Sequence, residues 1–127
     1  MENEFLNKIA EKCVAKFQDK IEAMVLFGSR AKGNYSDESD FDICIVGNLT
    51  LDEKSKIALY FPEEVDVSFF QELPPWIQIR VFGEGKFIFV KDLDKIYKIH
   101  SEVLRNYEDL RYFLNKKMIK RFGKCLT

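Results

Sequence analysis

The residues best suited to chemistry are aspartates that lie in or beside apolar segments. Asp40 and Asp42 flank Phe41 at the start of an apolar run. Because side chains of a strand alternate between its two faces, both carboxylates are expected to project from the same face. Two like charges held so close repel each other, so an ionised pair at this spacing indicates a bound divalent cation. Carboxylate oxygens prefer hard cations, which favours Mg²⁺.

Asp66 is a third candidate, because it lies in the alternating segment 64–68 at a position where strands favour Val or Ile. If this strand pairs beside the one that starts at Phe41, Asp66 reaches the same cation and could accept a proton from an attacking hydroxyl. A different register would bring Glu63 or Glu64 there instead, and an edge-strand charge without a catalytic role is the other alternative.

Gly28 and Ser29 end an earlier apolar run and predict a tight turn that seats phosphate groups. Residues 29–32 are expected to form a first helical turn with free amides. Glycine leaves room for a triphosphate, while the Ser29 hydroxyl and Arg30 could bond its oxygens. The alternatives are an ordinary strand-ending turn and, for Arg30, a surface charge.

Three further features have weaker chemical interpretations. Residues 28–33 resemble the start of a P-loop, but Asn34 and Tyr35 stand where that motif requires Lys and Ser or Thr, which argues against a P-loop ATPase. Tyr35 could stack on a nucleobase, although a tyrosine packed over a loop rim explains it equally. His100, the only histidine, lies in a predicted helix without a nearby nucleophile, so a packed or surface histidine is expected.

Short strands are predicted to hold these residues. Residues 23–27 and 41–46 are continuous apolar runs typical of strands buried on both faces, and the first is expected to be central. Residues 65–70 predict a third strand, and residues 87–90 an edge strand. The polar segment 33–39 predicts a surface loop.

Helices are predicted between and around these strands. From Asn3, a candidate cap, Phe5, Ile9, Cys13 and Phe17 recur every four residues. Thr50 and Glu53 form a capping-box sequence that predicts a short helix to about Tyr60. Pro74-Pro75 favours the start of a helix that stops at Gly83. From about Asp92 a long helix is expected, with one apolar stripe formed by Ile96, Ile99, Val103, Tyr107, Leu110 and Leu114.

The bulk properties favour one small α/β (α+β) domain spanning residues 1–127, with helices against a mixed sheet. The net charge of -1 disfavours a long polynucleotide substrate. Three cysteines, an acidic start and no apolar run of membrane length favour a reducing cytoplasm rather than export or a membrane.

Two surface features have open interpretations. The basic run near the C-terminus suits pairing with a helix dipole, or else a docking patch for an acidic partner or phosphate. The aromatics 76, 82, 87 and 89 favour core packing over an exposed partner-binding patch. The basic run consists of Lys116, Lys117, Lys120, Arg121 and Lys124, and the aromatics are Trp76, Phe82, Phe87 and Phe89.

The combined pattern, Gly28-Ser29, ten residues, then Asp40-Phe41-Asp42 in an apolar strand, resembles the nucleotidyltransferase superfamily of DNA polymerase beta. With Asp66 as the later carboxylate, the resemblance covers about residues 20 to 70. The short chain looks like the minimal nucleotidyltransferase (MNT) branch, whose members often act as antitoxins to HEPN-domain RNase toxins. The fold implied is that of the polymerase beta palm.

The resemblance implies that two Mg²⁺ ions are held by Asp40 and Asp42, with Asp66 joining them at the ion that activates the acceptor. Gly28 and Ser29 would hold the β- and γ-phosphates of ATP. In such sites a hydroxyl attacks the α-phosphorus in line and pyrophosphate departs. In MNT antitoxins the acceptor is a tyrosine of the partner toxin, so the product implied is an AMPylated, silenced RNase.

Two other functions remain open at this point. A non-catalytic antitoxin could neutralise its partner by binding alone, and the enzyme could instead modify a small hydroxylated molecule such as an aminoglycoside.

Overall fold

The structure, a computed structural model, describes residues 2–17, 19–27 and 41–122. Its strands form one four-stranded sheet of order β3-β2-β1-β4. β1 pairs antiparallel with both β2 and β4, whereas β2 and β3 run parallel. The predicted small mixed sheet is therefore confirmed, with β1 in its interior and β4 at an edge. The strands are β1 (Ile21–Phe27), β2 (Phe41–Gly47), β3 (Val65–Phe69) and β4 (Lys86–Val90).

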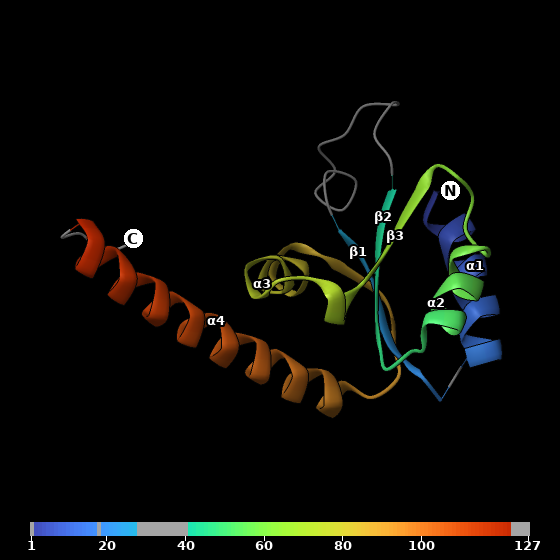
Figure 1. The fold of residues 1–127 in the computed structure, drawn as a ribbon. Helices are drawn as coiled ribbons and strands as arrows, with labels where there is room; N and C mark the ends of the chain where they lie inside the picture. Colours follow the sequence, from blue (N-terminus) through green and yellow to red (C-terminus); the bar gives the residue numbers. More distant parts are fainter. Residues whose placement is uncertain (1, 18, 28–40, 123–127) are drawn as a thin grey trace.

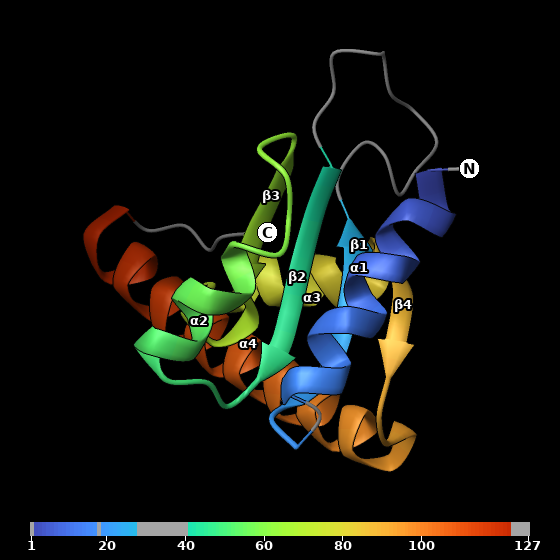
Figure 2. The same ribbon diagram turned by 90° about the vertical axis from the view of Figure 1, so that its right-hand side faces the viewer.

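Helices cover both faces of this sheet (Figure 1). α1 (Glu2–Phe17) and α2 (Leu51–Ala58) lie on one face, and α3 (Pro75–Glu84) and α4 (Leu93–Phe122) lie on the other, as Figure 2 also shows. A one-turn 3-10 helix, Phe70–Glu72, follows β3. The layers are those of an α/β fold.

A separate apolar cluster fills the space on each side of the sheet. The cluster beneath α1 and α2 includes Leu6, Ala10, Cys13, Phe17, Met24, Ile43, Ile45, Ile57 and Val65. The cluster beneath α3 and α4 consists of Ala23, Val25, Cys44, Val46, Phe70, Val81, Ile96 and Val103, with partly buried neighbours such as Ile99.

α1 forms as predicted, but its buried face differs from the expected one. The buried residues are Leu6, Ala10, Cys13 and Phe17, whereas Phe5 is 51% exposed. A repeat of four residues advances about 400° in a helix of 3.6 residues per turn, so its first member rotates away from the face that holds its last. The helix also begins at Glu2, which puts the proposed cap residue Asn3 inside it.

The capping box predicted for α2 is present. The Glu53 amide donates to Thr50 Oγ1 at 3.2 Å, and the Thr50 amide donates to Glu53 Oε1 at 2.9 Å. Both partners lie within four residues, so the local sequence was sufficient to locate this helix. It carries one fully buried residue, Ile57.

α3 starts at the predicted prolines but continues past Gly83 to Glu84. The capping residue is Gly85, whose amide donates to the Val81 carbonyl at 2.9 Å. A Cβ atom at position 85 would lie 2.3 Å from that carbonyl oxygen and 2.4 Å from Val25 Cγ1. The close approach of the turn to β1 therefore requires glycine at 85 and not at 83.

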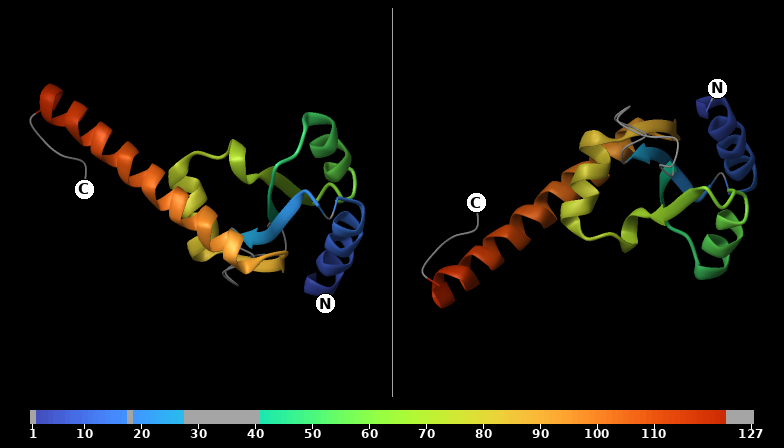
Figure 3. Two further views of the ribbon diagram at one scale, coloured as in Figure 1. Left: turned by 90° about the horizontal axis from the view of Figure 1, so that it is seen from below. Right: turned by 90° about the horizontal axis from the view of Figure 1, so that it is seen from above.

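α4 is the predicted long helix, but only its first half closes the domain. At its start, Asp92 Oδ1 accepts a hydrogen bond from the Asp94 amide at 3.0 Å. Ile96 and Val103 are buried, whereas Leu114 at the far end of the predicted stripe is 37% exposed. Figure 3 shows the C-terminal half extending past α3 and away from the sheet.

Of the four aromatics predicted to pack in the core, Phe82, Phe87 and Phe89 do so. Phe82 stacks on Phe70 with ring centroids 4.7 Å apart, and Phe87 lies 5.5 Å from Phe82. His100 packs edge-on against Phe82, which confirms a packed histidine. Trp76 is the exception, since it is 51% exposed. Within the described chain, no helix is both long and apolar enough to cross a bilayer.

Candidate active site

Asp42 and Asp66 are direct neighbours in the sheet. β2 and β3 run parallel, and the pairing joins Phe41 to Val65, Asp42 to Asp66 and Ile43 to Val67. Paired residues on adjacent strands, which lie about 4.8 Å apart, project to the same face. The predicted pairing of the two strands is confirmed, and it brings together Asp42 and Asp66, which are 24 positions apart in the chain.

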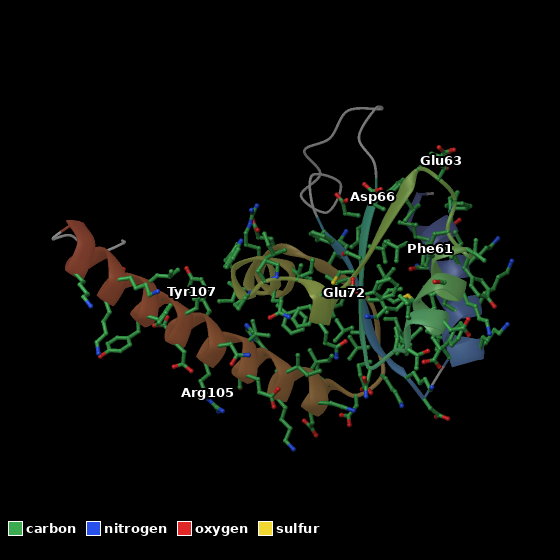
Figure 4. All side chains as sticks on the ribbon, in the orientation of Figure 1. Phe61, Glu63, Asp66, Glu72, Arg105 and Tyr107 are labelled. Carbon is green, nitrogen blue, oxygen red and sulfur yellow. The ribbon has the colours of Figure 1, made fainter. Side chains whose placement is uncertain are left out.

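Both carboxylates project from the sheet face that carries α3 and α4. Val65, Val67 and Phe69 pack against the cluster beneath α1 and α2, so the alternate residue Asp66 points the opposite way. Asp42 is half-buried and Asp66 is exposed. Figure 4 shows Asp66 near one end of the sheet, which leaves it accessible to a substrate.

The chain on either side of Asp42 contains the remaining candidates. Phe27, the last residue of β1, pairs with Asp42. Gly28, Ser29 and Arg30 follow Phe27 in the sequence and Asp40 precedes Phe41, but all four, like Tyr35, lie outside the described residues. Accordingly, no group of three metal-binding side chains occurs within the described ranges, which hold only two of the three predicted aspartates.

The register distinguishes Asp66 from its neighbouring acids. The Glu64 carbonyl accepts a hydrogen bond from the Phe41 amide at 3.2 Å, so Glu64 lies just before the paired segment. Glu63 belongs to the exposed turn that precedes β3 (Figure 4). It is Asp66 that pairs with Asp42, which removes the reason for preferring Glu63 or Glu64.

Cys44 and Ser68 follow the two aspartates on the same face, one step further along each strand. Cys44 is buried and pairs with Ser68, whose hydroxyl donates to the Ile43 carbonyl at 3.5 Å. Burial raises the pKa of the Cys44 thiol to about 12, although the hydrogen bond with Ser68 acts in the opposite direction. The thiol therefore stays protonated at neutral pH.

Neither Cys44 nor Ser68 was singled out in the sequence. The available signal was their spacing, because each lies two residues after an aspartate in a strand and so shares its face. They border the carboxylate pair on its inner side. Asp66 is exposed, and carboxylate oxygens facing solvent suit a hard cation that also binds phosphate.

A comparison with protein families matches residues 7–94 to the model described as polymerase beta, nucleotidyltransferase. The chain belongs to this family. The match covers more than half of the chain and contains every candidate site residue, from Gly28 to Asp66. It ends at residue 94, so nearly all of α4 lies beyond the segment that defines this nucleotidyltransferase family.

Two curated relatives are candidate protein adenylyltransferases of Methanocaldococcus jannaschii. The first is 35% identical over 78 residues, which cover 59% of this chain and 61% of the relative. The second is 43% identical over 49 residues, covering 39% of this chain and 45% of the relative. The chain therefore matches less than two thirds of the length of each of these relatives.

Solved structures share the fold over most of the chain. One chain of a crystal structure of a toxin-antitoxin with AMP-PNP has a TM-score of 0.69 at 20% identity, covering 90% of this chain and 95% of that chain. One chain of a tri-AMPylated Shewanella oneidensis HEPN toxin in complex with its MNT antitoxin has a TM-score of 0.64 at 18% identity, covering 93% and 96%. At these identities the likeness establishes the nucleotidyltransferase fold.

Proposed function

We propose that this chain is a Mg²⁺-dependent nucleotidyltransferase that transfers AMP from ATP to a tyrosine of a cognate HEPN RNase toxin, for which it serves as the antitoxin. The pairing of Asp42 with Asp66 carries the proposal, because it brings two carboxylates together on an accessible face of a nucleotidyltransferase fold. The family supports the reaction class, and the relatives' names support a protein acceptor.

The donor atoms at this site fit divalent magnesium. Asp42 and Asp66 offer carboxylate oxygens from adjacent strands, which are donors that a hard cation prefers, and Asp40 would complete the set. Two bound Mg²⁺ ions would supply charge neutralisation for the triphosphate and polarise the acceptor oxygen. The acidic pair would otherwise repel both the triphosphate and itself.

The chain's own groups would bind the donor and remove one proton. Gly28 and Ser29 would hold the β- and γ-phosphates, with Arg30 against the same oxygens. The acceptor oxygen forms a bond to the α-phosphorus while the bond to the bridging oxygen breaks, and pyrophosphate leaves with the electron pair. Asp66 would take the hydroxyl proton and, being exposed, pass it to solvent.

Such an enzyme would work in the cytoplasm, where ATP is available and the buried free cysteines Cys13 and Cys44 would stay reduced. No long nucleic acid is required as substrate, in keeping with the net charge of -1.

The test is AMP transfer measured on the partner. The protein, ATP, Mg²⁺ and the protein encoded by the adjacent gene are incubated, and the partner is weighed by intact mass spectrometry. Added AMP units are expected, and Asp42→Asn should slow their appearance about 10²-fold or more, the usual loss when a preorganised catalytic group is removed. Asp52→Asn, an exposed aspartate on α2, is the matched control and should react like the wild type.

The other outcomes identify the rival functions. A partner that is inhibited yet unmodified would favour a binding antitoxin without catalysis. Transfer of AMP to an aminoglycoside in the absence of any protein partner would favour a small-molecule enzyme. Equal rates for Asp42→Asn and the wild type would remove Asp42 from the site.

A further inference from the structure

The C-terminal half of α4, residues 105–122, forms an arm that projects beyond α3 (Figures 1 and 3). The last α4 residue in the core is Val103, and from Leu104 onward no described residue belongs to either apolar cluster. Among the residues that the structure describes, no helix therefore covers the α3-facing side of α4 along the arm. Figure 4 shows Tyr107 on this side and Arg105 on the opposite side.

The apolar stripe of α4 nevertheless continues along the arm. Its residues, called here the arm stripe, are Tyr107, Leu110, Phe113 and Leu114, whose spacing of three, six and seven residues puts them on one helix face. Phe113 is 53% exposed and Leu114 is 37% exposed, whereas Tyr107 and Leu110 are half-buried. An exposed stripe in line with a core-facing stripe is typical of a protein-binding helix.

Basic side chains border the arm stripe. Residues 110–127 contain six Lys and Arg and no acidic residue, whereas residues 1–109 contain 14 Lys and Arg against 21 Asp and Glu, a net charge of -7. Lys117 is exposed beside the arm stripe, with its Nζ 4.9 Å from the centre of the Phe113 ring, whereas Lys116 lies over Tyr112 on the other face. The surface thus combines apolar contact area with positive charge.

We propose that the arm stripe docks an amphipathic helix of the acceptor protein, with an apolar stripe bordered by Asp and Glu. The inference rests on the proposed function for the identity of that protein. α3 already packs against earlier turns of the same α4 face, so a partner helix beside α3 would extend an existing helix layer. Pairing two arms from two copies would oppose basic charge to basic charge, which disfavours self-association through this surface.

Docking on the arm would keep the acceptor on the face of the sheet that holds Asp42 and Asp66. That face carries α3 and α4, and the arm extends from it. The arm stripe lies on α4, whereas the two carboxylates lie on β2 and β3. The stripe would therefore contribute to the binding of the acceptor protein and not to phosphoryl transfer. Its loss should raise KM for the protein acceptor and leave kcat at saturation unchanged.

The experiment compares two substitutions two residues apart on opposite faces of the arm. The adjacent-gene protein is the probe, and its Kd is measured by calorimetry at fixed ionic strength. Leu114→Asp puts a charge in the arm stripe and should weaken binding about 10- to 100-fold, since burial of one leucine contributes on that order. Tyr112→Asp, on the opposite face and 63% exposed, should bind within about threefold of wild type.

Docking on the arm stripe is overturned by no binding of the probe to the wild-type chain, by equal loss in both variants, or by no loss in either. A wild-type dimer that Leu114→Asp dissociates in sedimentation would make a second copy the occupant. Loss of RNA binding with unchanged protein binding would make it a nucleic-acid surface. Thermal unfolding of Leu114→Asp should match wild type, because the arm lies outside the core clusters.

The experiments distinguish a failure of the docking proposal from a failure of the enzyme proposal. Asp42→Asn should bind the probe with wild-type Kd while transferring little AMP. If the wild-type chain binds through the arm stripe without adding AMP, the enzyme proposal fails and docking stands. If Leu114→Asp adds AMP with the wild-type KM for the probe, docking fails and the enzyme proposal stands.

Discussion

Replacing Cys13 and Cys44 with alanine should reduce the alkaline sensitivity of the fold. Burial raises the pKa of Cys13 from 9.0 to about 11 and that of Cys44 from 9.0 to about 12. Both thiols are fully buried, one beneath α1 and the other beside the carboxylate pair. Unfolding returns each thiol to water, where its pKa falls back to the ordinary value.

The free energy of unfolding falls as pH rises because the folded state keeps its thiol protons to higher pH than the unfolded state does. The folded pKa values lie above the unfolded one, so the stabilisation is fully present below about pH 9 and is lost as pH rises toward 11 and 12. Between about pH 8 and about pH 10, each unfolded thiol becomes roughly nine-tenths ionised, which favours unfolding by about 1.3 kcal/mol per thiol. The two together give a loss of about 2.5 kcal/mol.

Urea unfolding of wild type and of the Cys13→Ala, Cys44→Ala double variant at the two pH values measures this difference. The variant is less stable at both, because two buried side chains are shortened, but its free energy of unfolding should fall less with pH. Cys125, outside the described residues, is present in both proteins, so its contribution cancels. Equal losses in the two proteins would refute the reasoning that these thiols stay protonated in the fold.

Two further stability predictions use matched pairs of neighbouring positions. Gly85→Ala should destabilise the protein in urea unfolding because its Cβ would lie 2.3 Å from the Val81 carbonyl oxygen, whereas Gly83→Ala, with nothing within 4 Å of its Cβ, should stabilise α3 by up to about 1 kcal/mol. Leu6→Ala should cost about 2–5 kcal/mol because Leu6 is fully buried, and Phe5→Ala, at a position 51% exposed, should cost far less; equal costs would contradict the observed face of α1.

Features held by contacts between nearby residues could be predicted from the sequence. The capping box of α2 and the proline start of α3 each depend on a few consecutive residues, and both form as predicted. The end of α3 could not be predicted, because Gly85 is required by β1, which is distant in sequence. The buried face of α1 differs from the predicted one because a repeat of four residues departs from the helical period of 3.6.

The sequence pattern also could not predict that the C-terminal half of α4 projects from the domain. Its apolar stripe is continuous from Ile96 to Leu114, and periodicity alone predicts that such a stripe is covered throughout. Coverage depends on the length of the helix packed against it. α3 has 10 residues and α4 has 30, so only part of the longer helix is covered by the shorter one.

The pairing of Asp42 with Asp66 follows from the apolar residues around them. α2 connects β2 to β3 and supplies the crossover that two parallel strands need. The register is then set by Val65 and Val67, which must face the cluster beneath α1 and α2. A slip of one residue would turn Asp66 into that cluster and leave both valines on the open face, at the cost of burying an unpaired charge. The residues that pack the opposite side of the sheet therefore position the candidate carboxylates, which is why alternation around an acidic residue predicts that Asp66 lies on the same face as Asp42.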